Sequence, residues 1–437
     1  MSAVGQVVVR GGRLIDPAAG IDRVSDLLLA GGRVAALAEA ALPQAAGAEV
    51  IDARGLWVLP GLIDLHAHLR EPGHEYKETV LTGTRAAVAG GFTAVACMPN
   101  TVPANDSAAV TRAILRKAAE AGLARVYPIG CITAGQRGER MAEYGDLVGA
   151  GCRAFSDDGR PVMDAGVMRR ALEYSRHFDV AVISHCEDLH LAGDGVAHEG
   201  AVATRLGLKP IPAAAEEAMV AREVVLARQT GARVHIAHVS AAGSVAIIAA
   251  AKAEGLAVTA EATPHHFTLT DEALAGYDTA TKVNPPLRPL ADRTAVRRGL
   301  AEGIIDAIAT DHAPHGTIDK ELEFDAAASG MIGLETALPL ALRLVAAGEV
   351  SLHRVVEALT WRPARILGVP GGRLAPGDPA DVTLVDPEEE WPVEPDRFFS
   401  KSRNTPFAGW RLKGRVRATI VGGRVVFRDG AVIAVER

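Results

Sequence analysis

The feature that most constrains this chain is an eight-fold alternation between about Pro60 and Trp361, in which short apolar runs are followed by longer stretches with helical spacing. The runs are LWVLPGLIDLH, FTAVACMPN, RVYPIGCIT, CRAFSDD, VAVISHCED, RVHIAHVS, AVTAEATPHH and IIDAIATDH. Most of the helical stretches between them end at a glycine, the residue preferred at helix C-termini. Eight strand-then-helix units predict a parallel (β/α)8 barrel, the TIM barrel of the α/β class. A doubly wound sheet would instead show a glycine-rich phosphate turn after its first strand, which this sequence lacks.

The two ends of the chain have a different pattern, with Val- and Leu-rich segments joined by glycine pairs. Gly11-Gly12, Gly31-Gly32 and Gly422-Gly423 can supply the positive φ angles of tight turns, so we expect a β-hairpin at each pair. Neither end alone is large enough to bury a two-layer core. We therefore expect a small composite β-sandwich domain made of residues 1–57 plus 363–437, beside a barrel domain of residues 58–362.

Charge and cysteine content limit the partners and the compartment. The 46 Lys and Arg against 53 Asp and Glu give a net charge of −7 without a basic run, which argues against nucleic acid or an anionic membrane as a partner. No stretch approaches the roughly 20 apolar residues of a membrane span. Four cysteines without CxxC spacing indicate a reducing compartment, so we expect a cytoplasmic protein.

Polar residues gather where the apolar runs end, which in a barrel is the face that carries active sites. The first run ends at His66 and His68, and because side chains alternate along a strand, both imidazoles point the same way. His185 and His238 end two further runs, and Asp311 ends the eighth. Together with an aspartate from the fourth run, these four imidazoles and two carboxylates suit Zn²⁺ or a similar metal.

Other polar residues at the same strand ends leave alternatives open. The fourth run ends in Asp157-Asp158, and the pattern does not decide which aspartate binds the metal. His265-His266, at the end of the seventh run, can reach the site, although turn and core positions suit them better. A carboxylate at Asp311, held against a metal-bound water, can accept its proton and pass it to a leaving group.

Two segments, DLHAHLREP at 64–72 and ATDHAPH at 309–315 followed by Lys320, together resemble both signature motifs of the dihydroorotase family in the amidohydrolase superfamily. The resemblance continues through MPNT, SDDG, HCED, AHVS, VNPPLR, IGLETALP and KSRNTPF, and it is strongest to the longer bacterial type. It implies one or two Zn²⁺ per subunit, bound by His66, His68, Asp158, His185, His238 and Asp311. Related hydantoinases and allantoinases bridge two metals with a carboxylated lysine. Because this sequence has no lysine between Lys117 and Lys209, Asp158 is the expected bridge.

The reaction that the resemblance implies is the reversible cyclisation of N-carbamoyl-L-aspartate to L-dihydroorotate with loss of water, a step of pyrimidine (UMP) biosynthesis. Asp311 is the implied general acid and base. A guanidinium can bind a substrate carboxylate through two parallel hydrogen bonds, which suits Arg70. The other implied substrate contacts are Asn100, Asn284, His315 and the Ser329-Gly330 backbone, in a loop from about Gly316 to Gly330.

The sequence leaves two alternative functions to weigh. One is another cyclic amidohydrolase of hydantoinase or allantoinase type. Arg70 and Asn100 argue against it, because they favour a substrate that carries a carboxylate. The other is a non-catalytic scaffold subunit of aspartate transcarbamoylase, which we would expect to have lost metal ligands. We expect a small-molecule substrate and a homo-oligomer, a dimer. Metal identity, metal count and association with aspartate transcarbamoylase stay open.

Overall fold

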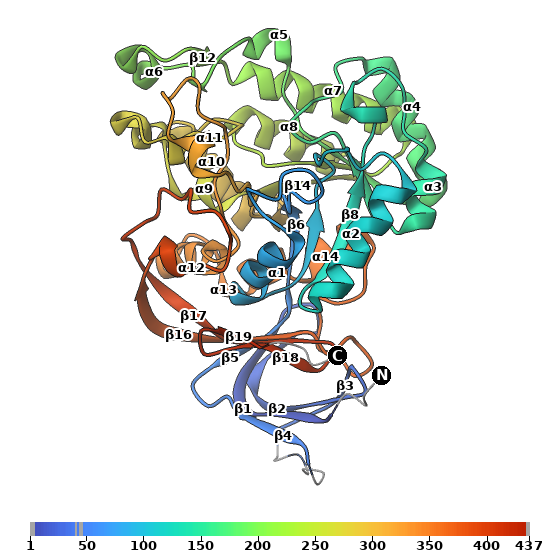
Figure 1. The fold of residues 1–437 in the computed structure, drawn as a ribbon, viewed down its shortest axis with the longest axis vertical. Helices are drawn as coiled ribbons and strands as arrows, with labels where there is room; N and C mark the ends of the chain where they lie inside the picture. Colours follow the sequence, from blue (N-terminus) through green and yellow to red (C-terminus); the bar gives the residue numbers. More distant parts are fainter. Residues whose placement is uncertain (1–4, 40–41, 43–46, 434–437) are drawn as a thin grey trace.

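The structure is a computed structural model that describes residues 5–39, 42 and 47–433. Eight parallel strands form a barrel-shaped sheet surrounded by helices, and a second sheet made of both chain ends lies against one end of it (Figure 1). The barrel strands are β6 (Leu62–Ala67), β7 (Phe92–Cys97), β8 (Arg125–Gly130), β9 (Ala154–Ser156), β10 (Ala181–Ser184), β13 (Val234–Ile236), β14 (Val258–Ala262) and β15 (Ala307–Ile308). Seven of the strands lie within predicted apolar runs and β6 extends one residue beyond its run, so the predicted fold class is confirmed.

Contacts between the first and last strands bring the barrel close to closure. Thr310, just after β15, donates to the buried Asp64 carboxylate of β6 from its backbone N at 2.8 Å and from Oγ1 at 2.5 Å. Two to three residues further along, Ala67 forms a parallel bridge with His312. The His68 N–H also donates to the His312 carbonyl, at 2.9 Å. The ends of β6 and β15, more than 240 residues apart in sequence, therefore lie side by side.

Amphipathic helices cover the outside of the barrel. The long ones are α1 (Val80–Ala89), α2 (Ala108–Ala121), α3 (Tyr144–Ala150), α4 (Ala165–Ser175), α7 (Ala214–Thr230), α8 (Ala242–Ala253), α10 (Leu290–Ala301), α12 (Ala337–Ala346), α13 (Leu352–Leu359) and α14 (Trp361–Leu367). Short elements, α5 (Leu189–Ala192), α6 (Ala201–Leu206), α9 (Pro264–Thr268), α11 (Thr317–Lys320) and the paired strands β11 (Ala197–His198) and β12 (Pro210–Ile211), lie in the connecting loops. As predicted, α2 and α7 end at left-handed glycines, Gly122 and Gly231. In the described ranges, no helix has both the length and the apolar character to cross a membrane.

The chain ends pair in one sheet of nine strands. They are β1 (Val7–Asp16), β2 (Ile21–Ala30), β3 (Arg33–Ala38), β4 (Glu49–Asp52), β5 (Trp57–Pro60), β16 (Val382–Pro392), β17 (Arg411–Val421), β18 (Arg424–Arg428) and β19 (Ala431–Val432). β5 pairs with β1 on one side and with β16 on the other, so it joins the N-terminal and C-terminal strands. Residues from both ends, such as Leu27, Val58 and Ile420, share one apolar cluster. The composite origin of this domain is thus confirmed, although its strands run in one continuous sheet.

One predicted hairpin is wrong, and both predicted domain boundaries fall inside elements of secondary structure. Gly11-Gly12 does not form a hairpin, because β1 continues through it with a bulge at which Gly11 has φ +71°. The turns at Gly31-Gly32 and Gly422-Gly423 do join antiparallel strands. The boundary placed after residue 57 falls inside β5, and the one placed at residue 363 falls inside α14, which packs against β6.

Candidate metal centre and substrate site

All six predicted metal-binding side chains converge at the carboxyl ends of the barrel strands, and all six are buried. His66 Nε2 lies 3.3 Å from Asp158 Oδ1 and 3.4 Å from Asp311 Oδ1. His68 Nε2 lies 3.1 Å from Asp311 Oδ1 and 3.4 Å from Asp158 Oδ2. The first and eighth strands therefore bring two imidazoles and a carboxylate against the aspartate that follows the fourth strand.

Asp158 is the residue that the two halves of the cluster share. Its Oδ1 lies 3.6 Å from both His185 Nδ1 and His238 Nε2. Two groups of ligand atoms, each within 4.8 Å of one another, can hold a metal: one from His66, His68 and Asp158, the other from Asp158, His185 and His238. The arrangement offers adjacent positions with Asp158 between them.

The neighbouring aspartate has a different environment. The Asp157 carboxylate accepts backbone hydrogen bonds from Ile132 N at 2.8 Å and from Thr133 N at 3.1 Å. It therefore ties the end of β9 to the loop after β8. Because these bonds occupy Asp157, the carboxylate that faces the histidines is Asp158, and the geometry favours Asp158 as the candidate metal ligand.

Within the part of the chain that the structure describes, two buried polar atoms of the cluster lack hydrogen-bond partners, and a metal ion would satisfy both. His66 Nε2 and Asp158 Oδ1 are buried and have no hydrogen-bond partner among the described residues. A buried polar atom without a partner carries a large desolvation cost, which a coordinated cation removes. Imidazole nitrogen and carboxylate oxygen are also the ligand atoms that Zn²⁺ and similar divalent ions prefer.

Three of the seven described non-glycine residues with a positive φ angle lie at the same place. Arg70, His238 and Asp311 have φ angles of +61°, +31° and +46°, which non-glycine residues adopt at an energetic cost. Each lies at or just beyond a barrel strand. Such strain persists only where the surrounding structure holds it, and it is typical of sites that must aim a side chain.

Glu261, on β14, is a member of the site that the sequence analysis missed. It is fully buried, with Oε1 2.7 Å from His66 Nδ1 and Oε2 3.0 Å from His235 Nε2. Burial alone would raise its pKa, but the hydrogen bonds to His235 and His66 outweigh burial and lower it to about 2. The ionised Glu261 accepts the His66 Nδ1–H and thereby leaves the Nε2 lone pair facing Asp158. A glutamate inside the apolar run AVTAEATPHH was the signal that could have identified it.

The predicted substrate contacts form two groups. Arg70 donates from Nε to Pro314 O at 3.2 Å, and its Nη2 lies 3.4 Å from His315 Nε2. His315 Nδ1 accepts from Lys77 Nζ at 3.2 Å, so Nε2 carries the hydrogen and donates to Ser329 O at 2.9 Å. Arg70, His315 and the Ser329-Gly330 segment are thereby brought together at one side of the barrel mouth.

Asn100 and Asn284 instead lie against the histidines. Asn100 Oδ1 accepts from His68 Nδ1 at 2.8 Å. Asn284 Nδ2 donates at 3.0 Å to Glu187 Oε2, which is 3.4 Å from His185 Nε2. In this structure both amides therefore contact groups that orient the metal centre.

The histidine pair after β14 is not part of the two groups of possible metal-binding atoms, although the buried His265 Nε2 has no hydrogen-bond partner among the described residues. His266 contacts Thr263 Oγ1 through Nδ1 at 2.8 Å and Pro285 O through Nε2 at 3.0 Å. Both ring nitrogens are therefore used within the fold. Neither His265 nor His266 belongs to the groups of possible metal ligands found in the described ranges, in line with the expectation that turn and core positions suit them better.

Comparison with known proteins identifies the family to which these residues belong. Residues 55–244 match a family model described as Dihydro-orotase-like. The chain is 58% identical over 424 residues to a dihydroorotase of Anaeromyxobacter dehalogenans, covering 97% of this chain and 98% of that one. It is 57% identical over 428 residues to a dihydroorotase of Pelotomaculum thermopropionicum, covering 98% and 100%.

Solved structures of hydantoinases share the fold. An L-hydantoinase from Arthrobacter aurescens superimposes with a TM-score of 0.87 at 26% identity, covering 98% of this chain and 97% of that one. A D-hydantoinase from Thermus sp. gives 0.85 at 25% identity, covering 98% and 96%. The sequence identity of this chain to the dihydroorotases is more than twice its identity to these hydantoinases. The chain therefore belongs to the dihydroorotase family.

Proposed function

We propose that this chain is a Zn²⁺-dependent cyclic amidohydrolase that interconverts N-carbamoyl-L-aspartate and L-dihydroorotate in pyrimidine biosynthesis. The observation that carries the proposal is the convergence of five side chains that can hold a metal, together with Asp311, beside a buried arginine in a chain whose full-length relatives are dihydroorotases. Amide hydrolysis needs an activated water and a proton donor for the leaving nitrogen. The substrate also needs a fixed cation for its carboxylate.

His66, His68, Asp158, His185, His238 and Asp311 would hold the metal, with Asp158 shared between adjacent positions. When bound, Zn²⁺ supplies a Lewis acid that polarises the ring amide carbonyl and lowers the pKa of a water molecule. Glu261 fixes the His66 tautomer that ligation requires, and Asn100 does the same for His68.

Asp311 is the proposed proton carrier. Its Oδ1 lies 3.1 Å from His68 Nε2 and 3.4 Å from His66 Nε2, so the Asp311 carboxylate is held beside the candidate metal ligands, where an ionised carboxylate can accept a proton. In the hydrolytic direction it takes the proton of the attacking water and delivers it to the departing ring nitrogen. Ring closure uses the same positions in reverse.

Arg70 is the proposed carboxylate anchor. Its guanidinium is buried, its Nε is bound to Pro314 O, and His315 Nε2 already donates to Ser329 O. Nη1 has no partner among the described residues, and Nη2 lies 3.4 Å from His315 Nε2, so the guanidinium keeps N–H groups that can bind a carboxylate through two hydrogen bonds. Because a hydantoin ring needs no such cation, Arg70 favours a carboxylate-bearing substrate over the hydantoinase alternative. The complete ligand set argues against the scaffold alternative.

Metal removal with matched substrates tests this proposal. We expect chelator-treated protein to lose dihydroorotate hydrolysis and to regain it with Zn²⁺, while hydantoin and allantoin are hydrolysed at least 100-fold more slowly. Faster turnover of hydantoin than of dihydroorotate would favour the alternative amidohydrolase. An inactive protein with a full complement of metal would contradict the proposed function.

We also propose a cytoplasmic location, supported by four buried cysteines without a disulfide.

A further inference from the structure

Three consecutive carbonyls at the end of the 316–330 loop are each bound by a side chain. Lys320 Nζ donates to Ala328 O at 2.7 Å and to Gly330 O at 3.1 Å. His315 Nε2 donates to Ser329 O at 2.9 Å. Asn404 Nδ2 donates to Gly330 O at 3.1 Å. The segment from Ala328 to Gly330 is therefore held from three separate parts of the chain, one of them in the C-terminal region.

Asn404 binds both ends of this loop with one amide group. Its Oδ1 accepts from His315 N at 3.2 Å, and its Nδ2 donates to Ala313 O at 3.0 Å as well as to Gly330 O. Its own carbonyl accepts from Ile332 N at 3.0 Å. Because Asn404 is 8% exposed and these bonds fix which amide atom is oxygen, the side chain sets the separation of the two loop ends.

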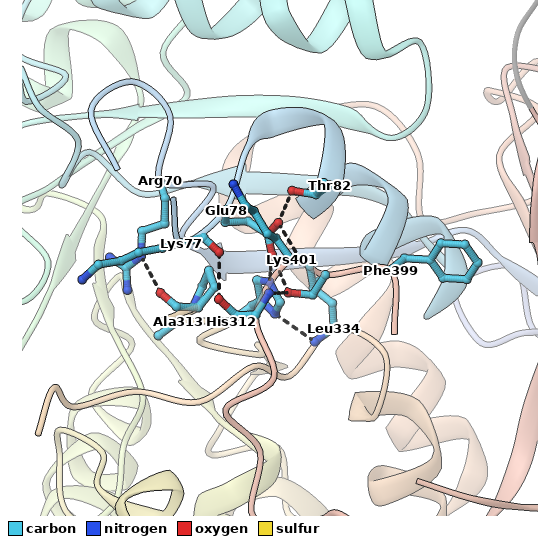
Figure 2. Close-up of polar contacts among 12 residues, drawn as sticks. Arg70, Lys77, Glu78, Thr82, His312, Ala313, Leu334, Phe399 and Lys401 are labelled. Atoms are coloured by element: carbon cyan, nitrogen blue, oxygen red, sulfur yellow. Dashed lines mark hydrogen bonds and ion pairs between the residues drawn. The ribbon is translucent and has the colours of Figure 1, made fainter. Parts of the chain in front are cut away.

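The segment that carries Asn404 is anchored to the barrel independently of the loop. Glu78, just before α1, accepts from Lys401 N at 3.1 Å and from Ser400 Oγ, and it lies 3.3 Å from His312 Nε2. Figure 2 shows Glu78 beside His312 and Lys401, with Arg70 on the same side of the cluster. The position of Asn404 is therefore fixed by the barrel as well as by the loop that it binds.

This arrangement leaves one backbone donor free. Ala328 N donates to Asp319 O at 3.0 Å, and Gly330 N donates to Lys282 O at 2.8 Å. Ser329 N makes no hydrogen bond within the described residues. Gly330 has φ +133°, and a Cβ added there would lie 2.7 Å from Ala313 Cβ, so the segment packs closely on the residues that follow Asp311.

We infer that Asn404 and Lys320 are positioning residues for the proposed reaction, which together hold the Ser329 N–H against the substrate beside Arg70 and His315. The inference rests on the proposed function and adds to it two residues that do not touch the substrate themselves. A hydrogen-bond donor that is already in place binds substrate without having to order the loop first. Without Asn404 the Ala313 carbonyl loses this donor, and without Lys320 the half-buried Ala328 carbonyl loses its donor, so either loss loosens the segment.

Kinetics of four variants test the inference. We expect Asn404→Asp, which keeps the size and the acceptor for His315 N but loses both donor bonds, to raise the KM for dihydroorotate about 10-fold with a change in kcat of less than about 3-fold. Lys320→Met should act similarly, and Lys320→Arg, which restores a donor, should recover most of the loss. Lys401→Ala is the matched control, because its exposed side chain binds Glu75 O and does not contact the loop.

The double variant Asn404→Asp/Lys320→Met is expected to raise KM less than the product of the two single effects, because the loss of either side chain already loosens the same segment from Ala328 to Gly330. Metal content and the midpoint of thermal unfolding are measured on every variant, so that a general loss of structure is seen as such. A folded, metal-loaded Asn404→Asp with a KM within 2-fold of wild type would overturn the inference alone. A metal-loaded wild type without dihydroorotate turnover would overturn the proposed function, and this inference with it.

Discussion

At the scale of single residues, the site is organised by what each buried polar atom contacts. Asp158 and Asp157 are adjacent and chemically identical, yet backbone N–H groups bind one of them and histidines face the other. Like Asp157, Glu261 is occupied by hydrogen bonds. Its carboxylate accepts from the rings of His66 and His235, so among the proposed metal ligands it contacts only the side chain of His66. Position within the local hydrogen-bond network, more than residue type, therefore decides which groups are available for catalysis.

Replacing Asp311 with Ala separates metal binding from proton transfer. Five proposed ligands remain, so we expect the variant to fold and to retain most of its metal. Turnover should fall by about 10²–10⁴-fold, the usual contribution of a general acid–base group. Steady-state kinetics together with metal analysis of the same sample would check this, and near-normal turnover would reject Asp311 as the proton carrier.

Replacing Arg70 with Met or Lys tests the carboxylate anchor. Met removes the charge at nearly the same length, so the KM for dihydroorotate should rise about 100-fold, consistent with loss of a charge-assisted hydrogen bond worth about 1.5–3 kcal/mol. Lys keeps the charge without the planar fork and should fall between Met and wild type. Equal KM values for the three proteins would assign the carboxylate to another residue.

At the scale of helices and strands, close approaches at glycines fix how elements pack. Gly90 ends α1 where a Cβ would lie 2.0 Å from the Leu334 carbonyl, ahead of α12. We expect Gly90→Ala to lower the free energy of unfolding by about 1–3 kcal/mol through overpacking. Gly149, exposed on α3 with no heavy atom within 4 Å of an added Cβ, is the matched control. Gly149→Ala should be neutral or stabilising by up to about 1 kcal/mol, and thermal unfolding of both variants measures the difference. Equal unfolding midpoints would contradict this packing.

The elements also show what the sequence could and could not predict. The eight strands were predictable because buried parallel strands are short apolar runs, and polar residues end them where the site lies. Gly11-Gly12 was misread because a glycine pair suits a bulge as well as a turn, and only the pairing of β1 with β2 on both sides of it distinguishes the two. Asn404 was beyond prediction, since its partners lie about 70 to 90 residues away.

At the scale of the whole molecule, the end sheet is joined to the barrel by specific polar contacts. Arg125 of β8 binds both carboxylate oxygens of Asp381, at 2.9 and 3.1 Å. Thr383 and Thr419 donate from Oγ1 to the carbonyls of Gly91 and Val88 at 2.6 and 2.7 Å. Stability and site geometry are therefore expected to depend on the C-terminal strands of the end sheet. Three statements from the sequence analysis stay predictions. They are the homodimer, the possible association with aspartate transcarbamoylase and the division into two domains.

Glu335 provides a pH test of this junction. Burial raises its pKa from 4.5 to about 8, although Phe399 N and Ser400 N donate to it. Between these values the folded protein holds a proton that the unfolded chain releases, so this group makes stability fall as pH rises from 4.5 to 8. Glu335→Gln removes that contribution. The difference in unfolding midpoint between Glu335→Gln and wild type should therefore shift in favour of the variant as the pH is raised from 5 to 8.5. Glu394→Gln, on the surface, is the control and should show no such shift. A constant difference would contradict the raised pKa.

Anomalous diffraction from crystals of the zinc-loaded protein tests the central claim most directly. The account predicts a peak at the zinc absorption edge between the histidines and Asp158, with ligand atoms at about 2.0–2.2 Å, and it predicts that the peak weakens when His66 or Asp158 is replaced by alanine. A zinc peak elsewhere in the molecule, or no peak at this cluster in protein that hydrolyses dihydroorotate, would contradict it.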